Sequence, residues 1–151
     1  MRLIGLDPGG TTGWAIMDIS ETTARWRMGQ IGPQEHHAEL YAFLEREHVQ
    51  KTVLISESFE YRREQRTNVE LISREYIGVA KLFAQERGTT YVQQTAAQGK
   101  AFWTDEKLKK TDLYVVGQQH ARDATRHVLY YFMNHSNLAP TVLADYLKRL
   151  K

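Results

Sequence analysis

A short apolar segment at the start of the chain, Leu3-Ile4-Gly5-Leu6, runs directly into an acidic residue, Asp7, and a glycine-rich turn. A strand that buries Leu3 and Leu6 brings the Asp7 carboxylate to the edge of a core, where an ionised group needs a partner. The turn Pro8-Gly9-Gly10-Thr11-Thr12 lets a phosphate or a metal approach the backbone closely. The first strand therefore presents Asp7 as a metal ligand, as part of a phosphate loop, or as a cap of its own turn.

Apolar periodicity along the chain alternates between strand-like and helix-like segments. Pro33 favours the start of a helix that continues to about Val49, and the capping-box spacing Thr67-Asn68-Val69-Glu70 marks a second helix, which Gly88 ends. The order predicts an α/β fold with a mixed five-stranded sheet, in which an antiparallel meander joins parallel strands. The expected elements are strands 2–7, 13–19 and 22–31, helix 33–49, strand 52–57, helix 67–87, strand 89–95, an irregular or partly helical segment 96–118, helix 119–135, and a short helix from Pro140.

Composition narrows the class of protein. The 151 residues fit one domain spanning 1–151. The absence of cysteine excludes disulfides, thiolate–zinc sites and cysteine nucleophiles. No apolar run approaches the roughly 20 residues that span a membrane, and the N-terminus enters a strand almost at once, so we expect neither a membrane partner nor a signal peptide. These features predict a soluble, cytoplasmic protein, and a net charge of +2 permits an anionic partner without demanding one.

Three further candidate ligands accompany Asp7. Glu57 closes the strand 52–57, while His120 and Asp123 lie three residues apart and so share one face of a helix. Ligands in such sheets gather beyond the strand ends, which brings Asp7 and Glu57 together. Carboxylates suit Mg²⁺, and histidine also admits Mn²⁺. The four residues are therefore the predicted catalytic and metal-binding set, holding one or two ions that activate a water and stabilise the leaving 3′ oxygen of a phosphodiester.

Each later ligand also has a structural alternative. Glu57 could form an ion pair with Arg62 or Arg63 in the loop that follows it. His120 could be a solvated residue at the start of its helix, and Asp123 could interact with the helix dipole. A shared site explains all of these residues together, whereas the alternatives require a separate explanation for each.

Two other groups lie close to this set. His127 follows His120 by seven residues and so lies on the same helix face, where it could support the site from a second shell or pack at the surface. Glu60 and Glu64 could replace Glu57 if the strand ends later than expected.

Basic clusters flank the acidic residues on both sides, and aromatic residues lie among them. A single charge run usually forms a solvated face, but two clusters around an acidic set favour a phosphate backbone. Aromatic residues, with Phe102 and Trp103 among them, suit stacking on unpaired bases, although core packing explains them equally well. The residues predicted to contact nucleic acid are Phe59, Tyr61, Arg62, Arg63, Arg66, Lys100, Lys107, Lys109 and Lys110.

Three segments together resemble the RuvC-type Holliday-junction resolvases, and their form is most similar to phage-encoded members. They are Leu6-Asp7-Pro8-Gly9 with the glycine-containing strand that follows, Ser56-Glu57-Ser58-Phe59, and Gln119-His120-Ala121-Arg122-Asp123-Ala124. The resemblance implies a ribonuclease H-like fold, a homodimer, and Mg²⁺- or Mn²⁺-dependent cleavage of branched DNA. The family's ligands correspond to Asp7, Glu57, His120 and Asp123, with aspartate in place of His120 in some members. It also implies that Phe59 or Tyr61 enters the junction and that Lys107, Lys109 or Lys110 contacts DNA.

The sequence thus predicts a structure-selective endodeoxyribonuclease that cleaves crossover junctions during DNA recombination and repair, in the host cytoplasm if the chain is phage-encoded. Because a four-way junction is close to two-fold symmetric, a homodimer would bring two sites to opposed strands. The helix 67–87, where Gly78 permits close approach, is the expected dimer surface.

Three alternatives remain open at this stage. An RNA-directed or RNA–DNA hybrid nuclease of the same superfamily would use the same phosphodiester chemistry, and a branched-DNA binder without activity would keep the fold. The segment Asp7–Thr12 also resembles the phosphate loop of actin- and sugar-kinase-type ATPases. Those proteins need a second lobe, for which 151 residues leave no room, so no nucleotide cofactor is expected.

Overall fold

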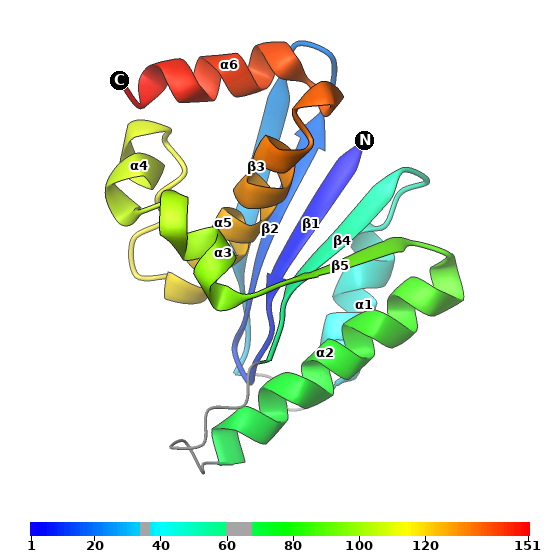
Figure 1. Ribbon diagram of the computed structural model, residues 1–151. Coiled ribbons are helices and arrows are strands. Elements are labelled where there is room, and N and C mark those ends of the chain that lie inside the picture. Colours follow the sequence, from blue (N-terminus) through cyan, green and yellow to red (C-terminus); the bar gives the residue numbers. More distant parts are fainter. Residues whose placement is uncertain (34–36, 60–67) are drawn as a thin grey trace.

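The computed structural model describes residues 1–33, 37–59 and 68–151 (Figure 1). Its strands are β1 (Arg2–Asp7), β2 (Thr12–Ile19), β3 (Ala24–Ile31), β4 (Thr52–Glu57) and β5 (Thr90–Gln94). Its helices are α1 (Ala38–Glu47), α2 (Asn68–Arg87), α3 (Ala96–Phe102), α4 (Asp105–Lys110), α5 (Gln119–Asn134) and α6 (Pro140–Arg149), with a 3-10 turn at Ser136–Leu138. None of the helices within these ranges is long and apolar enough to cross a membrane.

The sheet is mixed, as expected, with five strands in the order β3-β2-β1-β4-β5. β1, β2 and β3 form the antiparallel meander, while β4 runs parallel to both β1 and β5. Because Leu6 pairs with Ser56 across the parallel β1–β4 ladder, Asp7 and Glu57 follow at the same edge of the sheet. The two acidic strand ends are therefore neighbours.

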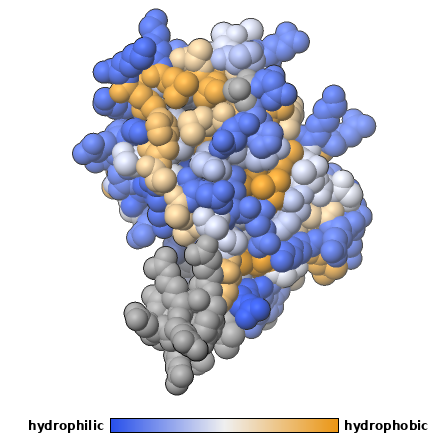
Figure 2. Space-filling model, viewed as in Figure 1, coloured by the Kyte–Doolittle hydropathy of each residue, from blue (hydrophilic) through white to orange (hydrophobic). Residues whose placement is uncertain are grey.

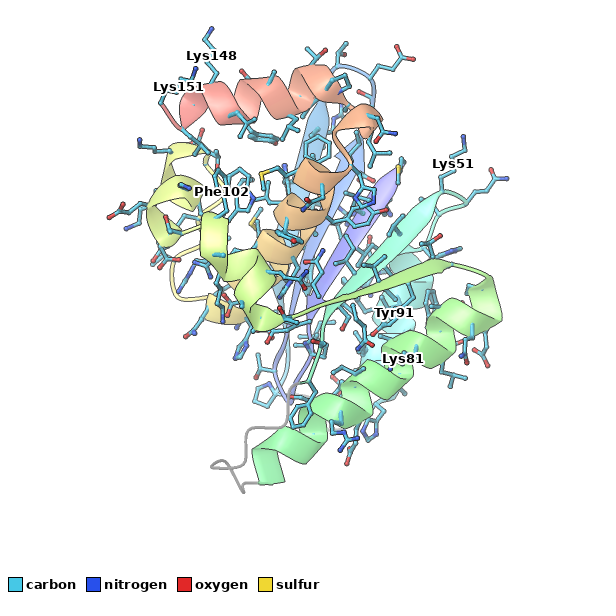
Figure 3. The ribbon with its side chains drawn as sticks, in the orientation of Figure 1. Lys51, Lys81, Tyr91, Phe102, Lys148 and Lys151 are labelled. Atoms are coloured by element: carbon cyan, nitrogen blue, oxygen red, sulfur yellow. The ribbon has the colours of Figure 1, made fainter. Side chains whose placement is uncertain are left out.

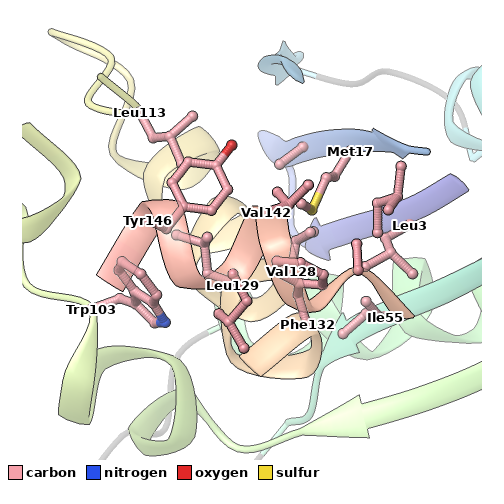
Figure 4. Close-up of a cluster of buried hydrophobic side chains, with 14 of the residues drawn as sticks. Leu3, Met17, Ile55, Trp103, Leu113, Val128, Leu129, Phe132, Val142 and Tyr146 are labelled. Carbon is pink, nitrogen blue, oxygen red and sulfur yellow. The ribbon is translucent and has the colours of Figure 1, made fainter. Parts of the chain in front are cut away.

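Both faces of the sheet are covered by helices (Figure 1). Alternate residues point to opposite faces. Ile4, Leu6 and Ile16 pack against α1 and α2. Leu3 and Met17 point the other way, into a cluster built from α5 and the C-terminal part of the chain (Figure 4). On the outside, Figure 2 shows hydrophilic residues over much of the visible face, with apolar residues gathered toward its upper part.

Two glycines in the sheet allow α5 to lie unusually close to it. A Cβ at Gly5 would lie 2.6 Å from the Ala124 carbonyl oxygen, and one at Gly13 would collide with the carbonyl group of His120. Side chains at these two positions would push the helix outward. Glycine on β1 and β2 therefore sets the height of α5, and with it the position of His120 above the strand ends.

Two expectations for helices differ from the structure. The predicted helix start at Pro33 is wrong: α1 begins at Ala38, and Gly32, just before Pro33, has a φ of 118°, which favours glycine. The same helix ends at Glu47 because His48 adopts an extended backbone conformation. The capping-box residue Thr67 lies outside the described residues, so the structure does not test that start of α2.

The close approach of α5 gives a direct stability test. We expect Gly5→Ala to lower the free energy of unfolding by about 1–3 kcal/mol, because the new methyl group must displace backbone of α5. Gly78→Ala is the matched control: among the described residues, a Cβ there meets nothing within 4 Å. That helical substitution should raise the free energy of unfolding by about 0.5–1 kcal/mol. Equilibrium urea unfolding measures both, and an unchanged value for Gly5→Ala would contradict the packing.

Candidate active site

Asp7 makes a direct contact with His120 at the end of β1. The Asp7 Oδ2 atom lies 2.7 Å from His120 Nδ1, and only 14% of the aspartate side chain is exposed. The Pro8–Thr12 turn is held by another residue, since the Thr12 hydroxyl donates to the Gly9 carbonyl at 2.9 Å. The Asp7 carboxylate is thus directed at α5, as a ligand-type residue would be, rather than at its own turn.

Burial and neighbouring charges act on this pair in opposite ways. Burial raises the pKa of the Asp7 carboxyl, the His120 hydrogen bond lowers it, and the negative charges of Glu57 and Asp123 raise it again. The pKa of His120 is raised, mainly because its ring is hydrogen-bonded to Asp7. The four predicted residues are therefore close enough to influence one another electrostatically.

His120 is placed by contacts that involve its backbone as well as its ring. Its backbone N–H donates to Gln30 Oε1 at 3.2 Å, and its carbonyl packs against Gly13 of β2. Its side chain is about half exposed, but the alternative of a purely solvated residue is wrong because the ring bonds to Asp7.

Glu57 is held by a buried histidine, His127. The sequence predicts that this residue either supports the site from behind a ligand or packs at the surface. His127 Nε2 lies 2.9 Å from Glu57 Oε2, while His127 Nδ1 lies 2.9 Å from Gln94 Oε1. The His127 side chain is only 1% exposed, so the surface alternative is wrong. Gln94 pairs with Glu57 across β4 and β5, so one sheet edge positions both partners of the ring.

Asp123 is almost fully buried and both of its carboxylate oxygens have cationic partners. Oδ2 lies 3.1 Å from Lys100 Nζ, and Oδ1 pairs with Arg126. Arg126 also pairs with Asp105 and donates to the Trp103 carbonyl at 2.7 Å. Because Asp123 lies beyond the first turn of α5 and is ion-paired, the helix-dipole alternative is wrong. The i, i+3 spacing of Asp123 and Arg126 was visible in the sequence, yet nothing indicated that Arg126 would be buried.

The chemistry of these donors fits a hard divalent cation, but their present arrangement does not form a metal centre. The negative charges of Glu57 and Asp123 raise the pKa of Asp7, and a dication would stabilise such a set of carboxylates. Within residues 1–33, 37–59 and 68–151, however, no three such ligands gather around one point. Each carboxylate is paired instead with its own neighbour: Asp7 with His120, Glu57 with His127, and Asp123 with Lys100 and Arg126.

The acidic residues line two depressions in the surface. Asp7 and Glu57 line a cleft of about 200 Å³ that is also bordered by Phe59. Asp123 lines a separate hollow of about 370 Å³ together with Lys100. A substrate in the cleft would therefore reach Asp7 and Glu57 first.

The predicted nucleic-acid residues have different surroundings. Phe59 borders the cleft and carries the Arg74 guanidinium 5.5 Å from its ring centre. Lys107 and Lys109 lie over the Phe102 and Tyr114 rings, 3.4 and 4.7 Å from their centres. Tyr61, Arg62, Arg63 and Arg66, together with the possible substitutes Glu60 and Glu64 and the pairing of Glu57 with Arg62 or Arg63, lie outside the described residues.

Two other residues make contacts within the chain. Lys110 Nζ donates to the Leu150 carbonyl at 3.0 Å, which ties α4 to the end of α6. Trp103 is fully buried in the cluster of Figure 4, so the idea that it stacks on bases is wrong. An indole without exposed area has no face to offer a base.

No protein-family model and no curated protein matches this chain. Solved structures do match. Thermus thermophilus RuvC in complex with a Holliday junction substrate has a TM-score of 0.64 and 19% identity, covering 92% of this chain and 98% of that one. The fowlpox virus resolvase, in complex with substrate Holliday junction DNA, has a TM-score of 0.59 and 13% identity, covering 89% and 99%. At these identities the likeness establishes the fold: the chain has the ribonuclease H-like fold of RuvC-type resolvases.

The shifted pKa values of the Asp7–His120 pair predict that the stability of the folded protein depends on pH. Because the pKa of Asp7 is raised in the folded protein, Asp7 contributes to stability below its unfolded-state pKa. This contribution is lost as pH rises through the folded-state pKa. The contribution of His120, with its raised pKa, is likewise present below 6.5 and lost as pH rises through its folded-state value. At alkaline pH the folded protein therefore holds a buried Asp7 carboxylate without a cationic partner.

Removing that carboxylate should stabilise the protein. We expect Asp7→Asn, in EDTA, to raise Tm by about 2–4 °C, the change that roughly 1 kcal/mol produces in a domain of this size. The gain should be larger at about pH 8.5 than at about pH 6, where His120 still offsets the charge. Asp145→Asn, which breaks an exposed pair with Arg149, is the control and should show no such gain. Equal Tm changes at both pH values would contradict the prediction.

Proposed function

We propose that this chain is a divalent-metal-dependent endonuclease that cleaves branched DNA, with the four-way Holliday junction as its main substrate. The observation that carries the proposal is the contact of Asp7 with His120, beside Glu57 and Asp123, at one edge of a RuvC-type sheet. Both structural relatives described above are bound to Holliday junction DNA, which supports this choice of substrate. The corresponding activity is that of a crossover junction endodeoxyribonuclease.

Asp7, Glu57, His120 and Asp123 would hold one or two Mg²⁺ or Mn²⁺ ions. When bound, such ions supply a deprotonated water for in-line attack on phosphorus and stabilise the 3′ oxygen that leaves. For this, Asp7 would exchange its contact with His120, and Asp123 its contact with Lys100, for contacts with the ions. His127 keeps Glu57 oriented through its bond to Gln94, and Arg126 keeps Asp123 near the cleft.

The surroundings of the cleft supply groups for the DNA. Phe59 and Tyr61 are proposed to contact unpaired bases at the branch point, and Arg62, Arg63 and Arg66 to contact the backbone that leaves it. On the other side, Lys100, Lys107, Lys109 and Lys110 are proposed to contact phosphates. Contacts of this kind position a strand without reading its sequence.

A homodimer is proposed because two cleavage sites must face opposed strands of a near-symmetric junction. The face of α2 around Gly78 is open, since a Cβ there would meet no atom within 4 Å in the described structure. The segment Asp7–Ala15 resembles phage-encoded resolvases, which supports a role in recombination or repair of phage DNA in the host cytoplasm.

Cleavage of defined substrates tests the proposal. With Mg²⁺ or Mn²⁺ we expect paired, symmetric nicks in a four-way junction, and less cutting of flaps, forks, duplex or RNA–DNA hybrid. Asp7→Asn should lose about 100-fold or more of the rate, since metal-ion stabilisation of the transition state is worth several kcal/mol. It should still bind the junction, and Asp145→Asn should cleave normally. Preferential cutting of the hybrid would instead support the RNA-directed alternative, and retained cleavage by Asp7→Asn would remove Asp7 from the mechanism.

His127 gives a second test, because its ring touches Glu57 but lines neither depression. We expect His127→Gln to raise the Mn²⁺ concentration for half-maximal cleavage by about 10–100-fold, the usual effect of losing a partner that orients a metal ligand. Junction affinity in EDTA should not change. His37→Gln removes an exposed histidine that contacts Glu75 and is the control. An unchanged Mn²⁺ requirement would show that His127 is only a packing residue.

A further inference from the structure

The hollow beside Asp123 has a charge pattern that the four-residue site does not explain. It lies where α3 and the loop before α4 meet the first turns of α5, and three cationic side chains line it: Lys100, Arg122 and Arg126. Two carboxylates, Asp105 and Asp123, also line it, so the hollow carries one excess positive charge. Its volume of about 370 Å³ is ample for a phosphate group.

The three cations differ in how far their hydrogen-bonding capacity is used. Each of the three side-chain nitrogens of Arg126 already has a partner, because Arg126 donates to Asp123, Asp105 and the Trp103 carbonyl. Arg122 donates from Nη1 to the Val115 carbonyl at 2.8 Å, whereas its buried Nε has no hydrogen-bond partner in the described structure.

The nearest carboxylate to that Nε is Asp105, whose Oδ1 is 3.5 Å away, beyond a good hydrogen bond. The guanidinium of Arg122 also lies over the Tyr114 ring, 4.8 Å from its centre, which fixes its orientation. A fixed guanidinium loses little conformational entropy when it binds an anion.

Lys100 is the second available cation. Its side chain is 48% exposed, and its ion pair with Asp123 Oδ2, at 3.1 Å, is its link to the site. Asp123 is also a proposed metal ligand. A divalent ion on that carboxylate would compete with Lys100 and leave its ammonium group free to bind another anion.

We propose that this hollow is a phosphate subsite. In it, Arg122 and Lys100 bind a backbone phosphate that neighbours the scissile phosphate of the DNA. The identity of the ligand as DNA rests on the proposed function. The presence of an anion-binding site does not, because it follows from the cations themselves. Arg126 is a positioning residue here: it holds Asp105 and Asp123 and leaves Arg122 and Lys100 to the phosphate. Guanidinium–phosphate pairs are the strong, charge-assisted kind.

The salt dependence of junction binding tests the subsite without any cleavage. In EDTA, we expect Arg122→Gln to weaken junction binding by roughly tenfold and to lower the slope of log K against log salt by about 1, as for the loss of one phosphate contact. Because Lys100 is paired with Asp123 when no metal is bound, Lys100→Gln should lower the slope in Ca²⁺ more than in EDTA.

Control variants separate the subsite from general charge and from misfolding. Lys51→Gln removes an exposed lysine beside the start of β4, at the end of the sheet away from the site (Figure 3). It should leave the slope unchanged within error. Arg122→Lys keeps the charge but loses the planar fork, so it should retain the slope and recover only part of the affinity. If Arg122→Gln unfolds, Arg122→Lys and Lys100→Gln carry the test.

Inorganic phosphate distinguishes the source of the anion. At equal ionic strength, phosphate should raise the Tm of the wild type above its value in chloride, and Arg122→Gln should lose that increase. A Tm effect of phosphate without any change in the junction-binding slope would overturn the assignment to DNA, and unchanged slopes for both Arg122→Gln and Lys100→Gln would overturn the subsite. A normal slope change in a protein that cleaves no junction would leave the subsite standing and reject the proposed nuclease.

Discussion

The close packing of α5 on the sheet is the constraint on which the rest of the site depends. Gly5 and Gly13 leave no side chain between β1 or β2 and the backbone of α5, so the helix lies directly over the strand ends. That height lets the His120 ring reach Asp7, and it places Asp123 and His127 one and two turns further along the same helix. A helix held further out would separate the acidic strand ends from the residues that complete them.

The second consequence is electrostatic. Asp7 and Glu57 at the sheet edge and Asp123 on α5 repel one another, and the protein offsets this with a partner for each: His120 for Asp7, His127 for Glu57, and Lys100 with Arg126 for Asp123. These partners stabilise the site as it stands, and binding of a dication would have to displace some of them. In the proposed function, Lys100, which pairs with Asp123 in the resting protein, then becomes available to a phosphate of the substrate.

The sheet and the acidic strand ends could be predicted because their signals are local. Leu3, Ile4 and Leu6 mark a strand, Asp7 marks its end, and the strand–helix–strand order fixes the neighbour that carries Glu57. The partners of the carboxylates were harder to predict, because Lys100 and His127 reach the site only through tertiary packing. For His127 the seven-residue spacing gave the correct face but not its burial. The short helix α3 did carry a local signal, a capping box between Thr95 and Gln98, which periodicity alone does not detect because the helix is so short.

Anomalous diffraction from crystals of the protein with a four-way junction and Mn²⁺ tests the central claim most directly. The account predicts a manganese peak bound by Asp7 together with at least two of Glu57, His120 and Asp123, and a Lys100 ammonium group that has left Asp123 for a phosphate. A junction complex whose manganese lies elsewhere, with Asp7 still bonded to His120 and Asp123 still paired with Lys100, would contradict it.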